Sequence, residues 1–253
     1  MLRLVIFSKR PTFLSLNRFE PKKNVSLALE AFALAYDSGK IPTDSRLVIA
    51  GGFDERVANC IHTLRLLQRV AEDHNLSHST TDLSAQVLFR TNLSEQQKLS
   101  YLKSRHTLAL LYTPSFEHLG IVPLEAMACG LPVIAVNNGG PLETIEDGQT
   151  GYLRPANKQD WSQAIVDLAN LSSPERQKMS SKGRQRVQDY FEVKVLAREV
   201  ERALRGVLTD AESGHIPDVW TDSATLQFLT AVSMGVLCCM SIAAMLYWRG
   251  SAP

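Results

Sequence analysis

The sequence predicts an α/β fold, in which a Rossmann-like parallel sheet carries helices on both faces and is followed by a C-terminal transmembrane helix. Short apolar, β-branched runs alternate with helical periods, which is the pattern of a parallel sheet. The chain of 253 residues is 45% hydrophobic, which is enough for a buried core. Residues 226–248 contain no charged side chain, and about 20 apolar residues suffice to cross a bilayer.

Domain organisation follows from these patterns. We expect an N-terminal extension at 1–11, an α/β lobe at 12–208, a polar linker at 209–225 and the membrane span at 226–248. Tyr247, Trp248 and Arg249 suit the interfacial end of a span. A buried or interfacial C-terminal helix is the alternative. Arginines before the span outnumber the one after it, which favours a cytosolic globular part.

Composition excludes two classes of function. Lys+Arg total 27 against Asp+Glu 26, so the net charge of +1 gives no support for a nucleic-acid partner. The four cysteines lack metal-ligand spacing, and no Asp-x-Asp pair occurs, so no metal site is predicted. Any anion site must therefore be local.

The first strand, Thr12–Leu16, leads into a loop that carries Arg18 and Lys23. An apolar helical period follows this loop. The elements expected next are a strand at 47–50 that ends in Gly51 and Gly52, a helix at 55–72, a strand at 86–89, a helix opened by a capping box at 94–97, and a strand at 108–111. The alternation predicts that all these strands are parallel.

The stretch 112–153 is the most informative part of the chain. Glu117 precedes and Glu125 lies within a short apolar helix that starts after Gly120 and ends at Gly130. A β-branched strand at 132–136 and a turn at 137–141 come next. Residues 158–208 then follow a helical pattern and are expected to pack onto the sheet.

Ligands of parallel sheets bind outside the carboxyl ends of the strands, so the loops after four strands should share one rim. The candidate residues on this rim are Arg18, Lys23, Gly51, Gly52, Glu117, His118, Gly120, Ile121, Val122, Glu125, Asn138, Gly139 and Gly140. Free amides at Gly120, Ile121 and Val122 suit a phosphate or pyrophosphate. Carboxylates accept from hydroxyls, so the two glutamates suit sugar and ribose. The pattern predicts a nucleotide-sugar site.

The E-x7-E spacing followed by AMACGLPVIA resembles the retaining GT-B glycosyltransferases of family four. The segment NNGGPLE is similar to the branch of α-1,3/1,6-mannosyltransferases that extend the dolichol-linked oligosaccharide of asparagine-linked glycosylation. The resemblance covers about residues 13–208 and matches only the C-terminal lobe of the GT-B fold.

This resemblance implies roles for individual residues. Arg18 and Lys23 would contact the donor diphosphate and stabilise its departure without a metal, Glu117 would face the transferred sugar, and Glu125 would hold the ribose. For the two cations alone the alternative is a solvated basic turn. His118 departs from the commoner glycine, and it is at least as often structural as catalytic. Gly51 and Gly52 either admit a base or phosphate or simply form a tight turn.

The resemblance also implies a donor, an acceptor and a location. The donor would be GDP-mannose, and the acceptor would be a lipid-linked oligosaccharide, extended by α-1,3 and then α-1,6 transfer with retention. No cofactor and no protein nucleophile are expected. The location would be the endoplasmic reticulum membrane, with the globular part facing the cytosol.

The resemblance leaves the acceptor-binding N-terminal lobe unmatched, which opens alternatives. A separate acceptor-binding subunit is one, and an inactive fragment is another. A third is a membrane-tethered nucleotide-sugar-binding module without activity of its own. A GT-B epimerase is disfavoured by the NNGGPLE loop and by the apolar tail.

Overall fold

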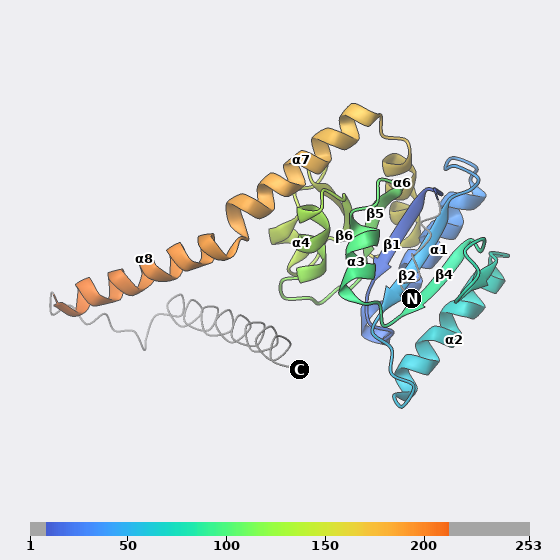
Figure 1. The fold of residues 1–253 in the computed structure, drawn as a ribbon, viewed down its shortest axis with the longest axis horizontal. Coiled ribbons are helices and arrows are strands. Elements are labelled where there is room, and N and C mark those ends of the chain that lie inside the picture. Colours follow the sequence, from blue (N-terminus) through green and yellow to red (C-terminus); the bar gives the residue numbers. More distant parts are fainter. Residues whose placement is uncertain (1–8, 213–253) are drawn as a thin grey trace. The chain divides into compact units, whose positions relative to one another are not determined.

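The computed structural model describes residues 9–212, and the chain divides into two units between Phe191 and Glu192 (Figure 1). The strands are β1 (Thr12–Leu16), β2 (Arg46–Gly51), β3 (His78–Ser79), β4 (Val87–Thr91), β5 (Thr107–Tyr112), β6 (Val133–Val136) and β7 (Gly151–Arg154). The helices are η1 (Pro21–Lys23), α1 (Val25–Asp37), α2 (Ala58–Asp73), α3 (Glu95–Leu102), α4 (Ile121–Ala128), α5 (Pro141–Thr144), α6 (Lys158–Ala169), α7 (Ser173–Tyr190) and α8 (Val193–Glu212).

All neighbouring strands of the seven-stranded sheet are parallel, in the order β3-β4-β2-β1-β5-β6-β7. From β1 the chain first builds the sheet outward through β2, and later crosses to β5 on the other side. The carboxyl ends of β1 and β5 therefore flank the topological switch point, where open α/β sheets bind their ligands.

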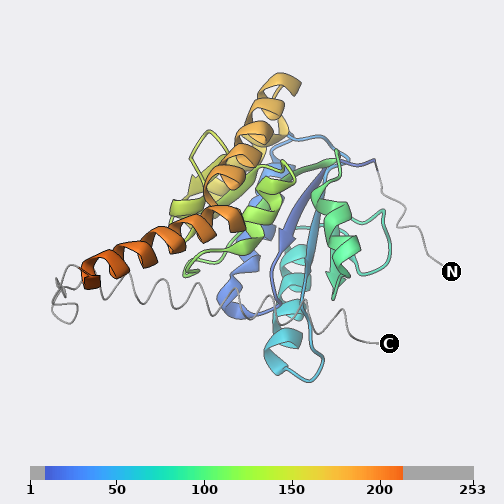
Figure 2. The ribbon, with the colours of Figure 1, turned by 60° about the vertical axis from the view of Figure 1, so that its left-hand side comes forward.

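Two apolar layers cover the faces of the sheet, and strand residues alternate between them. Phe13 belongs to the cluster under α1, α2 and α6, whereas Leu14 belongs to the cluster under α3 and α4. Trp161 of α6 is fully buried. Figure 2 shows helices on both sides of the strands. The predicted sheet architecture is confirmed.

Element bounds agree with the sequence pattern where local signals are strong. The first strand has the predicted bounds, and Ser94 and Gln97 form the expected capping box of α3. The helix predicted from residue 55 begins later, at Ala58, because Asp54 and Arg56 form a turn ahead of it. The edge strands β3 and β7 were not predicted. Their few residues carry no clear alternation.

The C-terminal helical run divides into three helices. α6 packs on the sheet as expected, α7 lies against α4, and α8 belongs to the second unit. Along α8, Arg202 pairs with Glu199 and Arg205 with Glu201. Because α8 continues to Glu212, the first residues of the predicted linker are helical.

The predicted membrane span at 226–248 lies outside the described residues, as do residues 1–8. Within residues 9–212, no helix is long and apolar enough to cross a bilayer.

Candidate functional site

An ion pair joins the two strand ends at the switch point. Lys23, at the end of η1 after β1, places its Nζ 2.6 Å from Oε2 of Glu117, in the loop after β5. The side chains are only 15% and 30% exposed. The structure thus brings together two of the three residues predicted to be catalytic. The third, Arg18, is 60% exposed and pairs with Glu20 at 2.9 Å.

Residues at the end of β5 position this ion pair. Thr113 donates its hydroxyl to the backbone carbonyl of Lys23 at 2.6 Å. Tyr112 is buried, and its ring lies about 3.2 Å from the position that a Cβ on Gly120 would take. The pKa of the Tyr112 hydroxyl is raised well above its usual range, mainly by burial. The negative charge of the neighbouring Glu117 carboxylate, and the hydrogen bond from Tyr112 to that carboxylate, raise this pKa further. Tyr112 and Thr113 were not predicted as site residues.

The predicted helix start after Gly120 is present. Gly120 precedes α4 with φ 79°, a left-handed conformation that favours glycine. Ile121 and Val122 open the helix, and Pro123 has no N–H, so the amides of Ile121 and Val122 are the donors that this terminus presents.

Glu125 is held by a lysine that the sequence did not reveal. Nζ of Lys98 in α3 lies 2.7 Å from Oε1 of Glu125 and 3.1 Å from Oε2 of Glu95. Partial burial works to lower the pKa of Lys98, but its hydrogen bonds to Glu125 and Glu95 outweigh burial and raise that pKa. The contact joins two helices that are distant in sequence, so no local signal predicts it.

A pocket of about 460 Å³ opens beside these residues. The predicted residues Arg18, Gly51, Gly52 and Val122 contribute to its lining. Asn92, Leu93, Glu95 and Lys98, from the end of β4 and from α3, complete its wall and were not predicted.

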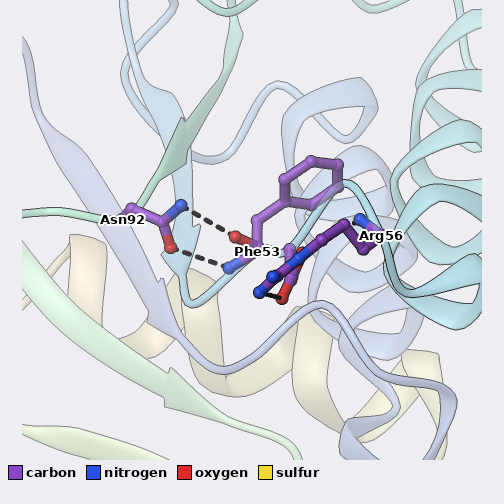
Figure 3. A network of polar contacts seen from close by, with 4 residues as sticks. Phe53, Arg56 and Asn92 are labelled. Carbon is purple, nitrogen blue, oxygen red and sulfur yellow. Dashed lines mark hydrogen bonds and ion pairs between the residues drawn. The ribbon is translucent and has the colours of Figure 1, made fainter.

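Asn92 lines this pocket, and Figure 3 shows its side chain bonded to the backbone of Phe53. Its side chain accepts from the Phe53 amide at 2.9 Å and donates to the Phe53 carbonyl at 2.8 Å, so it ties the loop after β4 to the loop after β2. In the same loop, the Arg56 guanidinium donates to both carboxylate oxygens of Asp54, at 3.0 and 2.8 Å. The loop after β2 is therefore tied to the loop after β4 by Asn92 and contains one ion pair of its own.

Three glycines of the rim, Gly51, Gly139 and Gly140, are required by close approach of backbone to backbone. A Cβ on Gly51 would lie 1.8 Å from the Asn17 carbonyl oxygen. On Gly139, which has φ +61°, a Cβ would lie 2.6 Å from the Glu117 carbonyl oxygen. Gly140 donates its amide to that same oxygen at 2.7 Å. Gly139 and Gly140 thus support the loop that carries Glu117.

Asn138 and His118 are exposed at this rim. Their side chains make no hydrogen bond or ion pair that the structure of residues 9–212 records. The site places the cations Arg18 and Lys23 and the start of α4 at the same rim as the carboxylates Glu117 and Glu125. The cations and the amides that open α4 can bind an anion, and the carboxylates can accept hydrogen bonds from hydroxyl groups.

Known proteins resemble this chain in sequence and in fold. Residues 3–186 match the family described as "Glycosyl transferases group 1". Over 219 residues the chain is 40% identical to the alpha-1,3/1,6-mannosyltransferase ALG2 of Saccharomyces cerevisiae, covering 78% of this chain and 43% of the relative. The protein of the same name in Dictyostelium discoideum is 40% identical over 199 residues, covering 76% and 45%. The chain thus spans about half the length of the curated relatives it matches.

Solved structures share the fold. A sucrose-phosphate synthase from Thermosynechococcus elongatus is 25% identical with a TM-score of 0.66, over 80% of this chain and 47% of that one. The C-terminal domain of a group 1 glycosyl transferase from Francisella tularensis is 22% identical with a TM-score of 0.59, over 73% of this chain and 89% of that domain. On its sequence match, its parallel sheet and its switch-point site, the chain belongs to the group 1 glycosyltransferase family and has the fold of a GT-B lobe.

Proposed function

We propose that this chain is the donor-binding half of a retaining mannosyltransferase, which moves mannose from GDP-mannose to a dolichol-diphosphate-linked oligosaccharide. The observation that carries the proposal is the contact between Lys23 and Glu117 at the switch point, next to the start of α4. Similarity to the ALG2 relatives supports the choice of mannose and of α-1,3 and then α-1,6 transfer.

The proposed chemistry depends on stabilising the departing diphosphate. The Lys23 ammonium has three donors, and Glu117 uses one of them, which leaves others for phosphate oxygens. Arg18 and the amides that open α4 add positive charge, so the nucleotide leaves without a metal ion. Glu117 accepts from the transferred sugar, and Glu125, oriented by Lys98, accepts from the ribose hydroxyls. Attack from the face that the diphosphate leaves gives retention and needs no protein nucleophile.

We further infer that the protein acts at the endoplasmic reticulum membrane with the α/β lobe on the cytosolic side. The uncharged segment 226–248 supports membrane attachment, and the relatives' function supports the location. A second polypeptide or a further part of the enzyme supplies acceptor binding.

A second candidate is a nucleotide-sugar-binding subunit without transfer activity of its own. It would use the same groups for the donor, Lys23, Glu117 and Glu125, and it differs from the first candidate in transfer alone.

The test is a chimera that joins the N-terminal half of that relative to residues 9–253 of this chain. We expect mannose transfer from GDP-mannose to a lipid-linked acceptor, lowered by about 10²-fold or more in Lys23→Ala, because a donor to the leaving charge is lost. Lys178→Ala, an exposed lysine on α7, is the control and should transfer normally. A folded chimera that binds GDP-mannose without transfer would favour the binding subunit. A folded chimera that neither binds nor transfers would contradict both.

A further inference from the structure

A second pocket lies at the opposite edge of the sheet from the switch point. It has a volume of about 340 Å³ and is formed where β5 and β6 begin, beside Thr107 and Pro132. Three segments meet there. The loop between α3 and β5 contributes Lys103 and Arg105, the loop between α4 and β6 contributes Cys129 and Gly130, and one face of α7 closes the third side.

The lining of this pocket is entirely without carboxylates but contains four cationic side chains. These are Lys103, Arg105, Arg176 and Arg184. The whole chain has a net charge of only +1, so the pocket is a local concentration of positive charge. Like charges brought together without a counter-ion repel each other, and a bound anion removes that cost.

The four cations do not have the same role. Arg176 is committed to the fold, because its guanidinium donates to the backbone carbonyls of Leu108 and Leu168. Arg105 donates to Nε2 of His106 at 3.3 Å. Among residues 9–212, the charged groups of Lys103 and Arg184 have no recorded hydrogen bond or ion pair. Both are therefore available to a ligand.

Backbone geometry brings Arg184 close to the floor of the pocket. Gly130 follows α4 with φ +77°, and its ideal Cβ position lies 1.7 Å from Nη1 of Arg184. The guanidinium thus occupies space that only glycine leaves free. Serine hydroxyls at 104, 173 and 180 add further donors to the lining.

The remaining titratable group in the pocket supplies no negative charge. Burial raises the pKa of the Cys129 thiol, and this effect outweighs the opposing influence of Lys103 and Arg184. Cys129 therefore stays protonated near neutral pH, and no thiolate compensates the cations. Lys103 and Arg184 both line the pocket that contains this sulfur.

We propose that this pocket is a second anion site, separate from the donor site, which binds a phosphate group between Lys103 and Arg184. A phosphate offers several acceptor oxygens to an ammonium and a guanidinium, and the guanidinium fork matches its geometry. Two sources share this chemistry, a free phosphate or diphosphate and the headgroup of an anionic lipid.

Cys129 provides a reporter inside the pocket. The test measures alkylation of Cys129 by iodoacetamide in the full chain at mildly alkaline pH, quantified by peptide mass spectrometry. The probes are inorganic phosphate, inorganic pyrophosphate and vesicles of phosphatidic acid, with sodium chloride at equal ionic strength and phosphatidylcholine vesicles as references. Glu125 and Lys98 of the donor site also influence the Cys129 sulfur, so two double variants, rather than the position of the readout, separate binding at the two sites.

We expect a bound phosphate to slow alkylation in proportion to occupancy, by about tenfold when the probe is at ten times its Kd. The double variant Lys103→Gln/Arg184→Gln should lose this protection while remaining folded, since both side chains are exposed and unpaired. The charge-matched double variant Lys40→Gln/Lys178→Gln, with both lysines exposed outside this pocket, should keep it.

The outcomes separate the two sources. Protection by phosphate or pyrophosphate supports a soluble ligand, and protection only by phosphatidic acid vesicles supports a lipid headgroup. Absence of protection by every phosphate probe would overturn the proposal, and so would equal protection in the Lys103→Gln/Arg184→Gln variant.

Discussion

At the scale of single residues, each carboxylate of the site is held by a lysine from another element. Lys23 holds Glu117, and Lys98 holds Glu125, at 2.6 and 2.7 Å. Partly exposed ion pairs contribute little to the free energy of unfolding, so their main effect here is on position. Each pair fixes where an acceptor oxygen lies before a ligand arrives.

Tyr112 gives a prediction at this scale. Its raised pKa favours the protonated hydroxyl in the folded state. Above about pH 10, the ordinary tyrosine pKa, the unfolded chain releases this proton and the folded chain keeps it, so stability that is present at lower pH is lost as pH rises. Tyr112→Phe has no hydroxyl to titrate, so this pH dependence of the free energy of unfolding is absent from the variant. At neutral pH we expect the variant to be about 1 kcal/mol less stable, because the hydrogen bond to Glu117 is lost.

The measurement is urea unfolding of both proteins from neutral pH to about pH 11. The two stabilities should converge above about pH 10, by at most about 1.4 kcal/mol per pH unit. Parallel curves would show that Tyr112 titrates alike in the folded and unfolded chain.

At the scale of elements, the loops rather than the helices and strands determine the site. The Gly139–Gly140 pair passes so close to the Glu117 loop that neither position has room for a Cβ. A helix terminus, a strand end and a turn therefore form one packed unit around Glu117.

Gly139→Ala tests that unit, and Gly148→Ala is its matched control. Both glycines have positive φ, +61° and +71°, but only Gly139 lacks space, because nothing lies within 4 Å of a Cβ on Gly148. Both variants should lose about 1 kcal/mol of stability from backbone strain. Only Gly139→Ala should also weaken binding of GDP-mannose, since it displaces Glu117, which accepts from the transferred sugar, and calorimetry would measure this. Equal affinity in the two variants would contradict the supporting role of Gly139.

Sequence predicted the elements better than their contacts. The alternation of strands and helices, and the rule for parallel sheets, placed Arg18, Lys23 and Glu117 on one rim, and the structure agrees. Lys98 and Asn92 were missed because their partners, Glu125 and Phe53, are remote in sequence. Such contacts depend on how helices and loops pack.

At the scale of the whole molecule, one sheet separates two edges with different chemistry. The carboxyl ends of the strands carry paired cations and carboxylates, whereas the amino ends of β5 and β6 carry cations alone. The first arrangement suits a ligand with both phosphates and hydroxyls, and the second suits a phosphate only.

The most direct test of the donor site is calorimetric titration of the chain with GDP and UDP in the presence of EDTA. We predict metal-free binding of GDP, with UDP weaker, and about a tenfold or greater loss of GDP affinity in Glu125→Gln, because a hydrogen bond to a charged group is worth about 1.5–3 kcal/mol. Glu143→Gln, an exposed carboxylate on α5, should bind GDP normally. Failure of the folded chain to bind GDP, or equal affinity in Glu125→Gln, would contradict the account.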